Sequence, residues 1–178
     1  MNLNLTTYDD KIPYLQRYEI WKYIVNSTYR LGWTDSLEPS KYDLNIHSEW
    51  TVKELQDSGI YPYIETAIKN TEWFTNKKII KIVVNLVRPD DVYYIHYHAD
   101  VQSVLYYVNL DWQDGWYGET IFYDPDDINS IAHTSSYIPG RLILFDGEIP
   151  HAIRPQSIKA PKYRFTLTVF YGVDKLLK

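Results

Sequence analysis

The sequence predicts a mainly β fold with supporting helices, arranged as a sandwich or jelly roll behind an N-terminal helical layer. Two observations carry this prediction. From residue 77 onward the chain consists of short runs rich in β-branched and aromatic residues, separated by Pro, Gly and Asp. Before residue 77, apolar side chains recur at helical spacing instead. The 18 Tyr, 6 Trp and 5 Phe agree with a β-rich chain, because aromatic side chains pack well on a pleated surface.

The N-terminal third is expected to be mostly helical. Apolar positions between Pro13 and Leu31 predict one long amphipathic helix, which Gly32 would end. The Pro-containing, polar stretch 35–45 is expected to be a loop, and helical turns are expected at 51–57 and 62–70.

The remainder is expected to form seven or eight strands, a number and spacing typical of a sandwich or jelly roll. The expected strands are 78–87, 93–98, 103–109, 120–123, 137–145, 151–154 and 163–171. We expect one domain over residues 1–178, with 1–76 as helical support and 77–172 as the jelly-roll core.

Composition excludes several classes of function. The chain has no cysteine, so any metal must be bound by His, Asp, Glu or Tyr, and neither disulfides nor a cysteine nucleophile can exist. A net charge of -5 does not favour nucleic acid as a partner. The N-terminus lacks the pattern of a signal peptide, and no apolar run is long enough to span a membrane, so we expect a cytoplasmic protein.

A first candidate for chemistry is His98-Ala99-Asp100, at the end of an expected strand. Residues two apart in an extended chain project from the same face, so one ion could contact both side chains. Two imidazoles and one carboxylate suit a non-haem Fe(II) oxygenase, and the third ligand would come from elsewhere in the chain. A solvated turn at the end of a strand is the alternative interpretation of this triplet.

A second candidate is Arg164 in the last expected strand. Arg164, Thr166 and Thr168 alternate with Phe165, Leu167 and Val169, so one face of the strand is polar and the other apolar. If the polar face lines the interior, the buried guanidinium needs an anionic partner, because burying it unpaired costs several kcal/mol. A diacid would supply that partner.

From about Lys78 to Tyr171 the chain resembles the iron(II)- and 2-oxoglutarate-dependent oxygenase superfamily, most closely its prolyl-hydroxylase-like branch. The segments that carry the resemblance follow the order of the family and cover a little over half of the chain. They are His98-Ala99-Asp100, Tyr106-Tyr107-Val108-Asn109, Gly118-Glu119-Thr120, 139–145, His151 and 164–168.

This resemblance implies a double-stranded β-helix, that is, a jelly roll backed by helices. It also implies that His98, Asp100 and His151 bind Fe(II) and that Arg164 binds the distal carboxylate of 2-oxoglutarate. Tyr107, Tyr94 and Thr166 would complete the cosubstrate site.

The activity implied is hydroxylation of an unactivated C–H bond in a peptidyl or free amino acid, with O2 as oxidant and ascorbate as a supporting reductant. The chain is similar in size and motifs to small bacterial and bacteriophage members, which places it in the cytoplasm, or in the host cytoplasm for a phage protein. An Asp ligand favours hydroxylation over halogenation.

Several positions leave alternatives open. Tyr117 stands where many relatives have glycine, and the longer segment between His151 and Arg164 makes Arg154 a rival for the cosubstrate contact. Trp112, Trp116 and Tyr117 could form a substrate lid or a hydrophobic loop anchor. His96 could serve the site or be an ordinary strand residue, with the second interpretation favoured.

The competing class of function is a non-catalytic or zinc-dependent jelly-roll module, similar to cupins, that binds a metal or a small ligand. Arg164 together with Tyr107 argues against it, because such a module needs no dicarboxylate anchor deep in the barrel.

Overall fold

The computed structural model describes residues 3–33, 45–71, 78–91 and 93–172. The helices are α1 (Tyr14–Val25), α2 (Val52–Asp57) and α3 (Tyr61–Ile68). The strands are β1 (Leu5–Tyr8), β2 (Arg30–Trp33), β3 (Asn45–Trp50), β4 (Ile79–Val87), β5 (Val101–Tyr107), β6 (Thr120–Asp124), β7 (Asp127–Ser135), β8 (Leu142–Asp146), β9 (His151–Ile153) and β10 (Arg164–Gly172).

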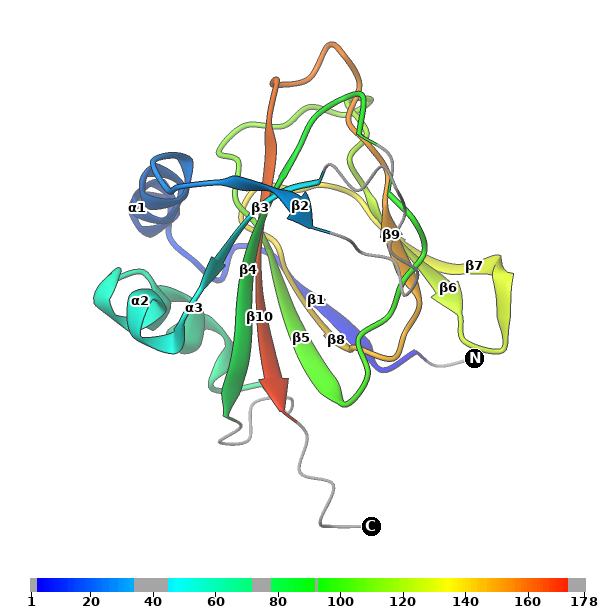
Figure 1. The fold of residues 1–178 in the computed structure, drawn as a ribbon, viewed down its shortest axis with the longest axis horizontal. Coiled ribbons are helices and arrows are strands. Elements are labelled where there is room, and N and C mark those ends of the chain that lie inside the picture. The colour runs from blue at the N-terminus through cyan, green and yellow to red at the C-terminus, as the bar shows by residue number, and fades with distance from the viewer. Residues whose placement is uncertain (1–2, 34–44, 72–77, 92, 173–178) are drawn as a thin grey trace.

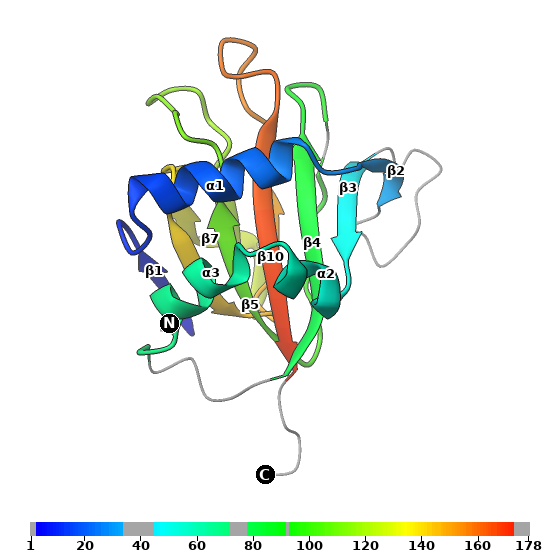
Figure 2. The ribbon, with the colours of Figure 1, turned by 90° about the vertical axis from the view of Figure 1, so that its left-hand side faces the viewer.

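Two antiparallel sheets form the β layers. The larger has the order β1-β8-β5-β10-β4-β3-β2 and the smaller the order β7-β6-β9. The helices cover the outer face of the larger sheet, while the smaller sheet lies on its other side (Figures 1 and 2). This confirms the mainly β jelly-roll architecture with supporting helices.

Strand alternation divides the apolar side chains between two cores. On β10, Phe165, Leu167 and Val169 face the helices and join the core that includes Ile20 and Ile64. A second core lies between the sheets and consists of Leu105, Tyr107, Phe122, Tyr137, Ile143, Phe145 and Ile149. Burial of each aliphatic side chain in these cores stabilises the folded state by about 1.5–3 kcal/mol. The expected alternation of β10 is therefore confirmed, and its Arg164 face lines the space between the sheets.

The N-terminal third differs from its predicted helical form. The first helix ends at Val25, and Gly32 lies inside β2 with φ 105° instead of ending a helix. The strands β1, β2 and β3 belong to the larger sheet, so this third supplies sheet edges as well as helices. The predicted loop at 35–45 lies largely outside the described residues, and Asn45 begins β3.

The strands differ from those expected in two more places, one strand that does not form and one that was not predicted. Residues 93–98 were expected to form a strand, but within them only His96 forms a bridge, opposite His151. The strand β7 was not expected, because eight of its nine residues are exposed and show no apolar pattern. None of the helices in the described ranges has the length and apolarity needed to cross a membrane.

Candidate metal and cosubstrate site

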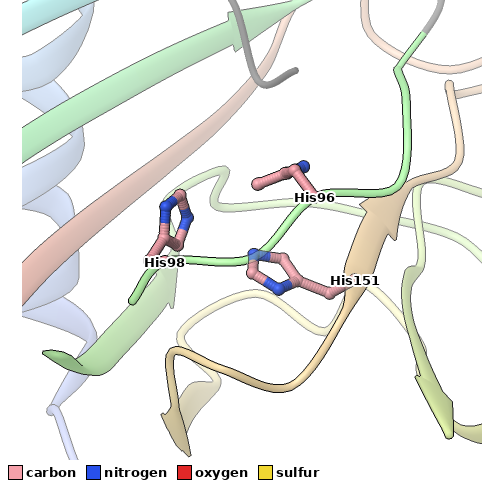
Figure 3. A group of neighbouring side chains, drawn as sticks. All are labelled: His96, His98 and His151. Atoms are coloured by element: carbon pink, nitrogen blue, oxygen red, sulfur yellow. The ribbon is translucent and has the colours of Figure 1, made fainter. Parts of the chain in front are cut away.

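Three histidines gather at one end of the space between the sheets. His96 and His98 lie on the segment that leads into β5, and His151 begins β9 (Figure 3). One nitrogen from each ring lies within 4.8 Å of the other two, a spacing that a single metal ion could bridge. His96 and His151 are buried, and the ring of His98 packs edge-on against Phe170 at 4.8 Å between centroids.

Hydrogen bonds fix the orientation of two of these rings. Nδ1 of His151 lies 2.8 Å from the carbonyl oxygen of Ile149, and Nδ1 of His96 lies 3.1 Å from that of Tyr94. A carbonyl can only accept, so Nδ1 carries the proton in both rings, and each Nε2 keeps a lone pair for a metal.

The electrostatics also suit a metal. Burial, together with the neighbouring His96 and the Lys81 ammonium, lowers the pKa of His98 to about 3. Burial, together with His96 and His98, lowers the pKa of His151 well below its usual value. Both rings are therefore neutral at physiological pH, which is the form that binds metal ions.

Asp100 lies outside this cluster. It follows His98 in a turn and has φ 62°, in the left-handed region. Among the described residues, His98 and His151 form a potential metal-binding group with His96, and Asp100 is not part of that group. Its predicted role as a ligand stays a prediction.

Arg164 is buried and lines the same cavity as the histidines. The cavity has a volume of about 30 Å³, and the three histidines, Arg164, Thr166 and Thr168 contribute to its lining. The side chain of Arg164 has no exposed surface, and its guanidinium lies 4.7 Å from the ring of Tyr137 and 5.4 Å from that of Tyr107.

The guanidinium is only partly satisfied by the protein. Nε donates to the carbonyl oxygen of Gly118 at 2.8 Å. Neither Nη1 nor Nη2 has a hydrogen-bond partner among the described residues, and the same holds for the Thr166 hydroxyl. Burying cationic hydrogen-bond donors without partners costs free energy, so the part of the cavity next to Arg164 is suited to an anion.

Gly118 makes this position of Arg164 possible. It has φ +86°, and a Cβ there would lie 3.2 Å from both Cδ and Nε of Arg164. Glycine is therefore required both by the backbone conformation and by the close approach of the arginine.

The other predicted cosubstrate residues are placed as follows. The buried Tyr107 hydroxyl lies 2.9 Å from Oγ1 of Thr120 and 3.2 Å from the carbonyl oxygen of Ser135, to either of which it can donate. The Tyr94 side chain is 52% exposed and is not among the cavity-lining residues, whereas its carbonyl orients His96.

Arg154 is not a rival to Arg164 within the cavity. Its guanidinium lies 3.7 Å from the centre of the Tyr117 ring and 3.7 Å from the carboxylate of Glu119. It is not among the residues that line the cavity.

The aromatic loop is held to the second core through Trp112. The Trp112 ring packs against Tyr137 at 4.3 Å between centroids, and its Nε1 donates to the carbonyl oxygen of Tyr117 at 2.9 Å. Tyr117 has φ 62°, the conformation that a glycine would adopt readily. This favours the loop-anchor interpretation for Trp112, while the lid interpretation of Trp116 and Tyr117 stays a prediction.

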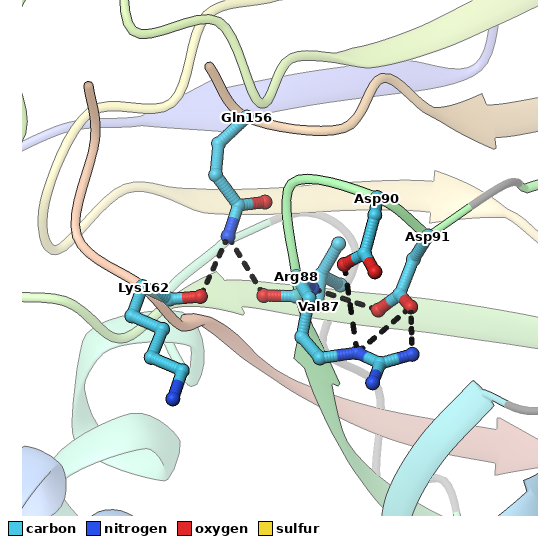
Figure 4. A network of polar contacts seen from close by, with 6 residues as sticks. All are labelled: Val87, Arg88, Asp90, Asp91, Gln156 and Lys162. Atoms are coloured by element: carbon cyan, nitrogen blue, oxygen red, sulfur yellow. Dashed lines mark hydrogen bonds and ion pairs between the residues drawn. The ribbon is translucent and has the colours of Figure 1, made fainter. Parts of the chain in front are cut away.

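The longer segment between His151 and Arg164 is fixed at its base by Gln156. Its buried amide donates to the carbonyl oxygen of Val87 at 2.7 Å and to that of Lys162 at 3.5 Å (Figure 4). Beside it, the guanidinium of Arg88 pairs with the buried carboxylate of Asp91 at 2.6 Å. The chain thus returns to β10 in a fixed register despite the added length.

A larger hollow lies elsewhere. An open groove of about 860 Å³ runs between α1, β3 and α2 on the helical side of the molecule. Its described lining contains no histidine, so it is no rival to the histidine-lined cavity as a metal site.

Sequence comparison finds neither a family model nor a curated protein that matches the chain. Comparison of structures does find similar proteins. A Trichoplax adhaerens prolyl hydroxylase, solved in complex with a peptide fragment of the oxygen degradation domain of hypoxia inducible factor, aligns with a TM-score of 0.68 and 17% identity, over 96% of this chain and 84% of that one.

Two further solved structures align almost as fully. A 2OG-Fe(II) oxygenase family oxidoreductase from Burkholderia pseudomallei has a TM-score of 0.67 and 12% identity, over 95% of this chain and 85% of that one. The non-heme alpha-ketoglutarate-dependent epimerase SnoN of nogalamycin biosynthesis has a TM-score of 0.68 and 12% identity, over 96% and 78%. The chain therefore has the fold that its motifs implied, the fold of prolyl hydroxylases and other 2-oxoglutarate oxygenases.

Proposed function

We propose that this chain is an Fe(II)- and 2-oxoglutarate-dependent dioxygenase that hydroxylates an unactivated C–H bond. The observation that supports this most is that one cavity is lined both by a histidine cluster and by a buried arginine whose two terminal nitrogens have no hydrogen-bond partner among the described residues. A metal site alone occurs in many classes of protein. A chelating diacid requires both a metal ion for its chelating end and a buried guanidinium for its distal carboxylate.

The protein residues would divide the work as follows. His98 and His151 would bind the iron, and Arg164 would bind the distal carboxylate of 2-oxoglutarate through both Nη atoms. Leu105, Phe145 and Phe170 would exclude water from the cavity that they line. When bound, iron and 2-oxoglutarate supply the oxidising chemistry, in which one atom of O2 enters the substrate and the other enters succinate, with release of CO2.

The cavity must widen to admit the cosubstrate. Its volume of about 30 Å³ is far smaller than 2-oxoglutarate. We therefore expect side chains of the lining to shift on binding, with the arginine kept in place by Gly118 and Tyr137.

The substrate class that we propose is a peptidyl or free amino acid, with proline as the first candidate. Its support is the likeness to a prolyl hydroxylase that was solved with a peptide. The likeness to an epimerase shows that this fold also serves other reactions, so the substrate needs its own experiment.

A zinc-dependent or non-catalytic metal-binding module is the second candidate. The all-histidine cluster favours it, since three neutral imidazoles are a common ligand set for zinc. It leaves the buried arginine unexplained.

Anaerobic titration of the apoprotein with Fe(II) and 2-oxoglutarate tests the proposal. We expect the weak visible charge-transfer band of the chelate in the native protein. Loss of two charge-assisted hydrogen bonds costs about 1.5–3 kcal/mol or more, so Arg164→Ala should need at least about tenfold more cosubstrate, with a smaller loss for Arg164→Lys. Arg154→Ala is the matched control and should bind cosubstrate normally.

Two outcomes would contradict the proposal. If no band forms at any concentration while zinc binds tightly, the metal-binding module becomes the better description. If Arg154→Ala weakens cosubstrate binding and Arg164→Ala does not, the anchor is misassigned. Where the band forms, release of succinate with prolyl peptides, compared with free amino acids, identifies the substrate class.

A further inference from the structure

We propose that the ion pair between Lys81 and Glu49 is a substrate site, which binds the carboxylate and the ammonium group of a free amino acid beside the proposed metal site. This inference rests on the proposed function and deepens it. It narrows the substrate class from peptidyl or free amino acids to the free zwitterion.

The strand register places Lys81 next to the histidines. Lys81 is directly opposite Phe170 in the pairing of β4 with β10. The Phe170 ring lines the cavity and packs edge-on against His98 at 4.8 Å between centroids. Directly opposed residues project side by side from one face of a sheet, so Lys81 projects from the face that carries the cavity. Burial is the main cause of the lowered pKa of His98, and the Lys81 ammonium contributes to it.

Glu49 reaches Lys81 from the neighbouring strand. Glu49 is opposite Val83 in the pairing of β3 with β4, and Val83 lines the cavity. Lys81 lies two residues before Val83 and therefore shares its face, which makes Glu49 a diagonal neighbour of Lys81. Nζ of Lys81 lies 3.2 Å from Oε1 of Glu49. The ion pair thus stands on the same face of the sheet as the cavity.

Arg30 fixes the carboxylate of this pair. Its Nη2 donates to Oε2 of Glu49 at 2.7 Å, and its Nε donates to Nε2 of the buried His47 at 3.3 Å. Arg30, Glu49 and Lys81 therefore form a row of charges that alternate in sign, from the edge strand β2 to β4. The row has one more positive than negative charge, in a chain whose net charge is -5.

The row is open to a ligand from solvent. The side chains of Lys81, Glu49 and Arg30 are 43%, 34% and 64% exposed. Exposed ion pairs contribute little to the stability of a fold, so stability alone does not account for three aligned charges beside the cavity.

The chemistry of the pair matches a zwitterion. In a free amino acid the carboxylate and the ammonium group are attached to one carbon atom, so they lie close together, as Nζ of Lys81 and Oε1 of Glu49 do. An ammonium group has three donors and a carboxylate accepts several hydrogen bonds, so each member of the pair can take the opposite charge of the ligand and keep its partner. A residue inside a peptide has neither charge, so this site favours the free amino acid.

Anaerobic calorimetry of the protein with Fe(II) and 2-oxoglutarate tests this proposal through binding instead of turnover. The probes are free amino acids, beginning with proline, their carboxamides, which lack the negative charge, and their N-acetyl derivatives, which lack the positive charge. We expect at least one free amino acid to bind about tenfold more tightly than either derivative, because a hydrogen bond between charged groups is worth at least about that factor.

Variants of the pair assign each preference to one residue. Lys81→Met should remove the preference for the acid over the carboxamide, and Lys81→Arg should restore most of it. Glu49→Gln should remove the preference for the free amine over the N-acetyl form. Lys53→Met is the matched control, because Lys53 forms an exposed ion pair with Asp57 within α2, and it should keep both preferences. Circular dichroism checks that each variant is folded.

Three results would overturn the proposal. The first is that no free amino acid binds, or that free and blocked forms bind equally to the native protein. The second is an acid preference that survives in Lys81→Met, since the carboxylate would then be bound elsewhere. The third is tighter binding of an end-blocked prolyl peptide than of any free amino acid, which would make the substrate peptidyl.

The oxygenase proposal fails by a different result. Binding of a free amino acid with both preferences, but without a charge-transfer band on addition of Fe(II) and 2-oxoglutarate, would support the zwitterion site and contradict the oxygenase. A band without either preference would support the oxygenase and contradict the zwitterion site.

Discussion

Replacing Gly118 by alanine should weaken cosubstrate binding, although neither a histidine of the metal site nor the arginine is itself substituted. A Cβ at this position would lie 3.0 Å from Cζ2 of Trp112 and 3.2 Å from Cδ and Nε of Arg164. Contacts this short require the neighbours to move. Arg164 can move only by giving up its hydrogen bond to the Gly118 carbonyl oxygen, 2.8 Å from Nε.

The magnitude can be worked from two contributions. An L residue at φ +86° carries strain of about 1–2 kcal/mol, which lowers the stability of the fold. Displacement of the guanidinium affects the ligand instead, and a hydrogen bond to a charged group is worth about 1.5–3 kcal/mol. We therefore expect 2-oxoglutarate to bind about 10- to 100-fold more weakly to Gly118→Ala.

Gly115→Ala separates the two contributions. Gly115 has φ +81°, but a Cβ there would meet nothing within 4 Å. Both variants should lose about 2–8 °C in Tm, as expected for 1–2 kcal/mol in a chain of this size. Only Gly118→Ala should need more cosubstrate in the anaerobic Fe(II) titration. Equal cosubstrate affinity in the two variants would refute the assignment of Arg164 as the anchor held by Gly118.

Three further predictions follow from the same structure. Gly147→Ala should weaken Co(II) binding, because the added Cβ would collide with the carbonyl oxygen of His98; unchanged affinity would show that this loop does not position the ring. Tyr117→Gly and Tyr117→Ala both lose the contact with Arg154, worth about 0.5–1 kcal/mol, but only Tyr117→Gly relieves the backbone strain at φ 62°. Urea unfolding should therefore show Tyr117→Gly to be the more stable variant, and the reverse order would contradict the strain. The apoprotein should lose stability as pH falls below about 6.5, because the pKa values of His98 and His151 are lowered in the folded state and the unfolded chain therefore binds more protons. The loss should reach up to about 1.4 kcal/mol per pH unit for each buried imidazole. A free energy of unfolding in urea that stays constant between about pH 6.5 and 5 would contradict this.

The parts of the fold that the sequence predicted best are those where burial imposes a strict period. On β10, the alternation of Thr166 with Phe165 and Leu167 predicted which side chains face the interior, and the structure confirms it. The strand β7 shows the opposite case. Its residues are almost all exposed, so no face had to be apolar and no pattern marked it.

The N-terminal helix was extended too far for a related reason. Apolar residues continue through Leu31, and their spacing fits a helix and a strand edge equally well over so few residues. The chain instead leaves the helix after Val25 and pairs β2 with β3. That pairing depends on a strand 15 residues later in the chain, which local spacing cannot show.

The site, too, contains residues that the sequence predicted and one that it did not. The sequence predicted that His98, His151 and Arg164 belong to one site, the histidines from motif order and Arg164 from strand alternation, and the structure places all three side chains at the same cavity. The position of His96 beside His151 depends on the bridge between them, a contact between distant segments. The signal was present in His96-Tyr97-His98, since two residues of that spacing share a face as surely as His98-Ala99-Asp100 would.

The histidine cluster has one consequence for how the molecule holds together. His98 leads into β5 of the larger sheet, whereas His151 belongs to β9 of the smaller one. A bound ion would therefore cross-link the two sheets through its bonds to the histidines, as a disulfide does in secreted sandwiches, in a chain that has no cysteine. Depletion of metal should then open the seam between the sheets before the helical side unravels. Limited proteolysis would register this as early cuts near Glu148, with the helices α1, α2 and α3 still protected.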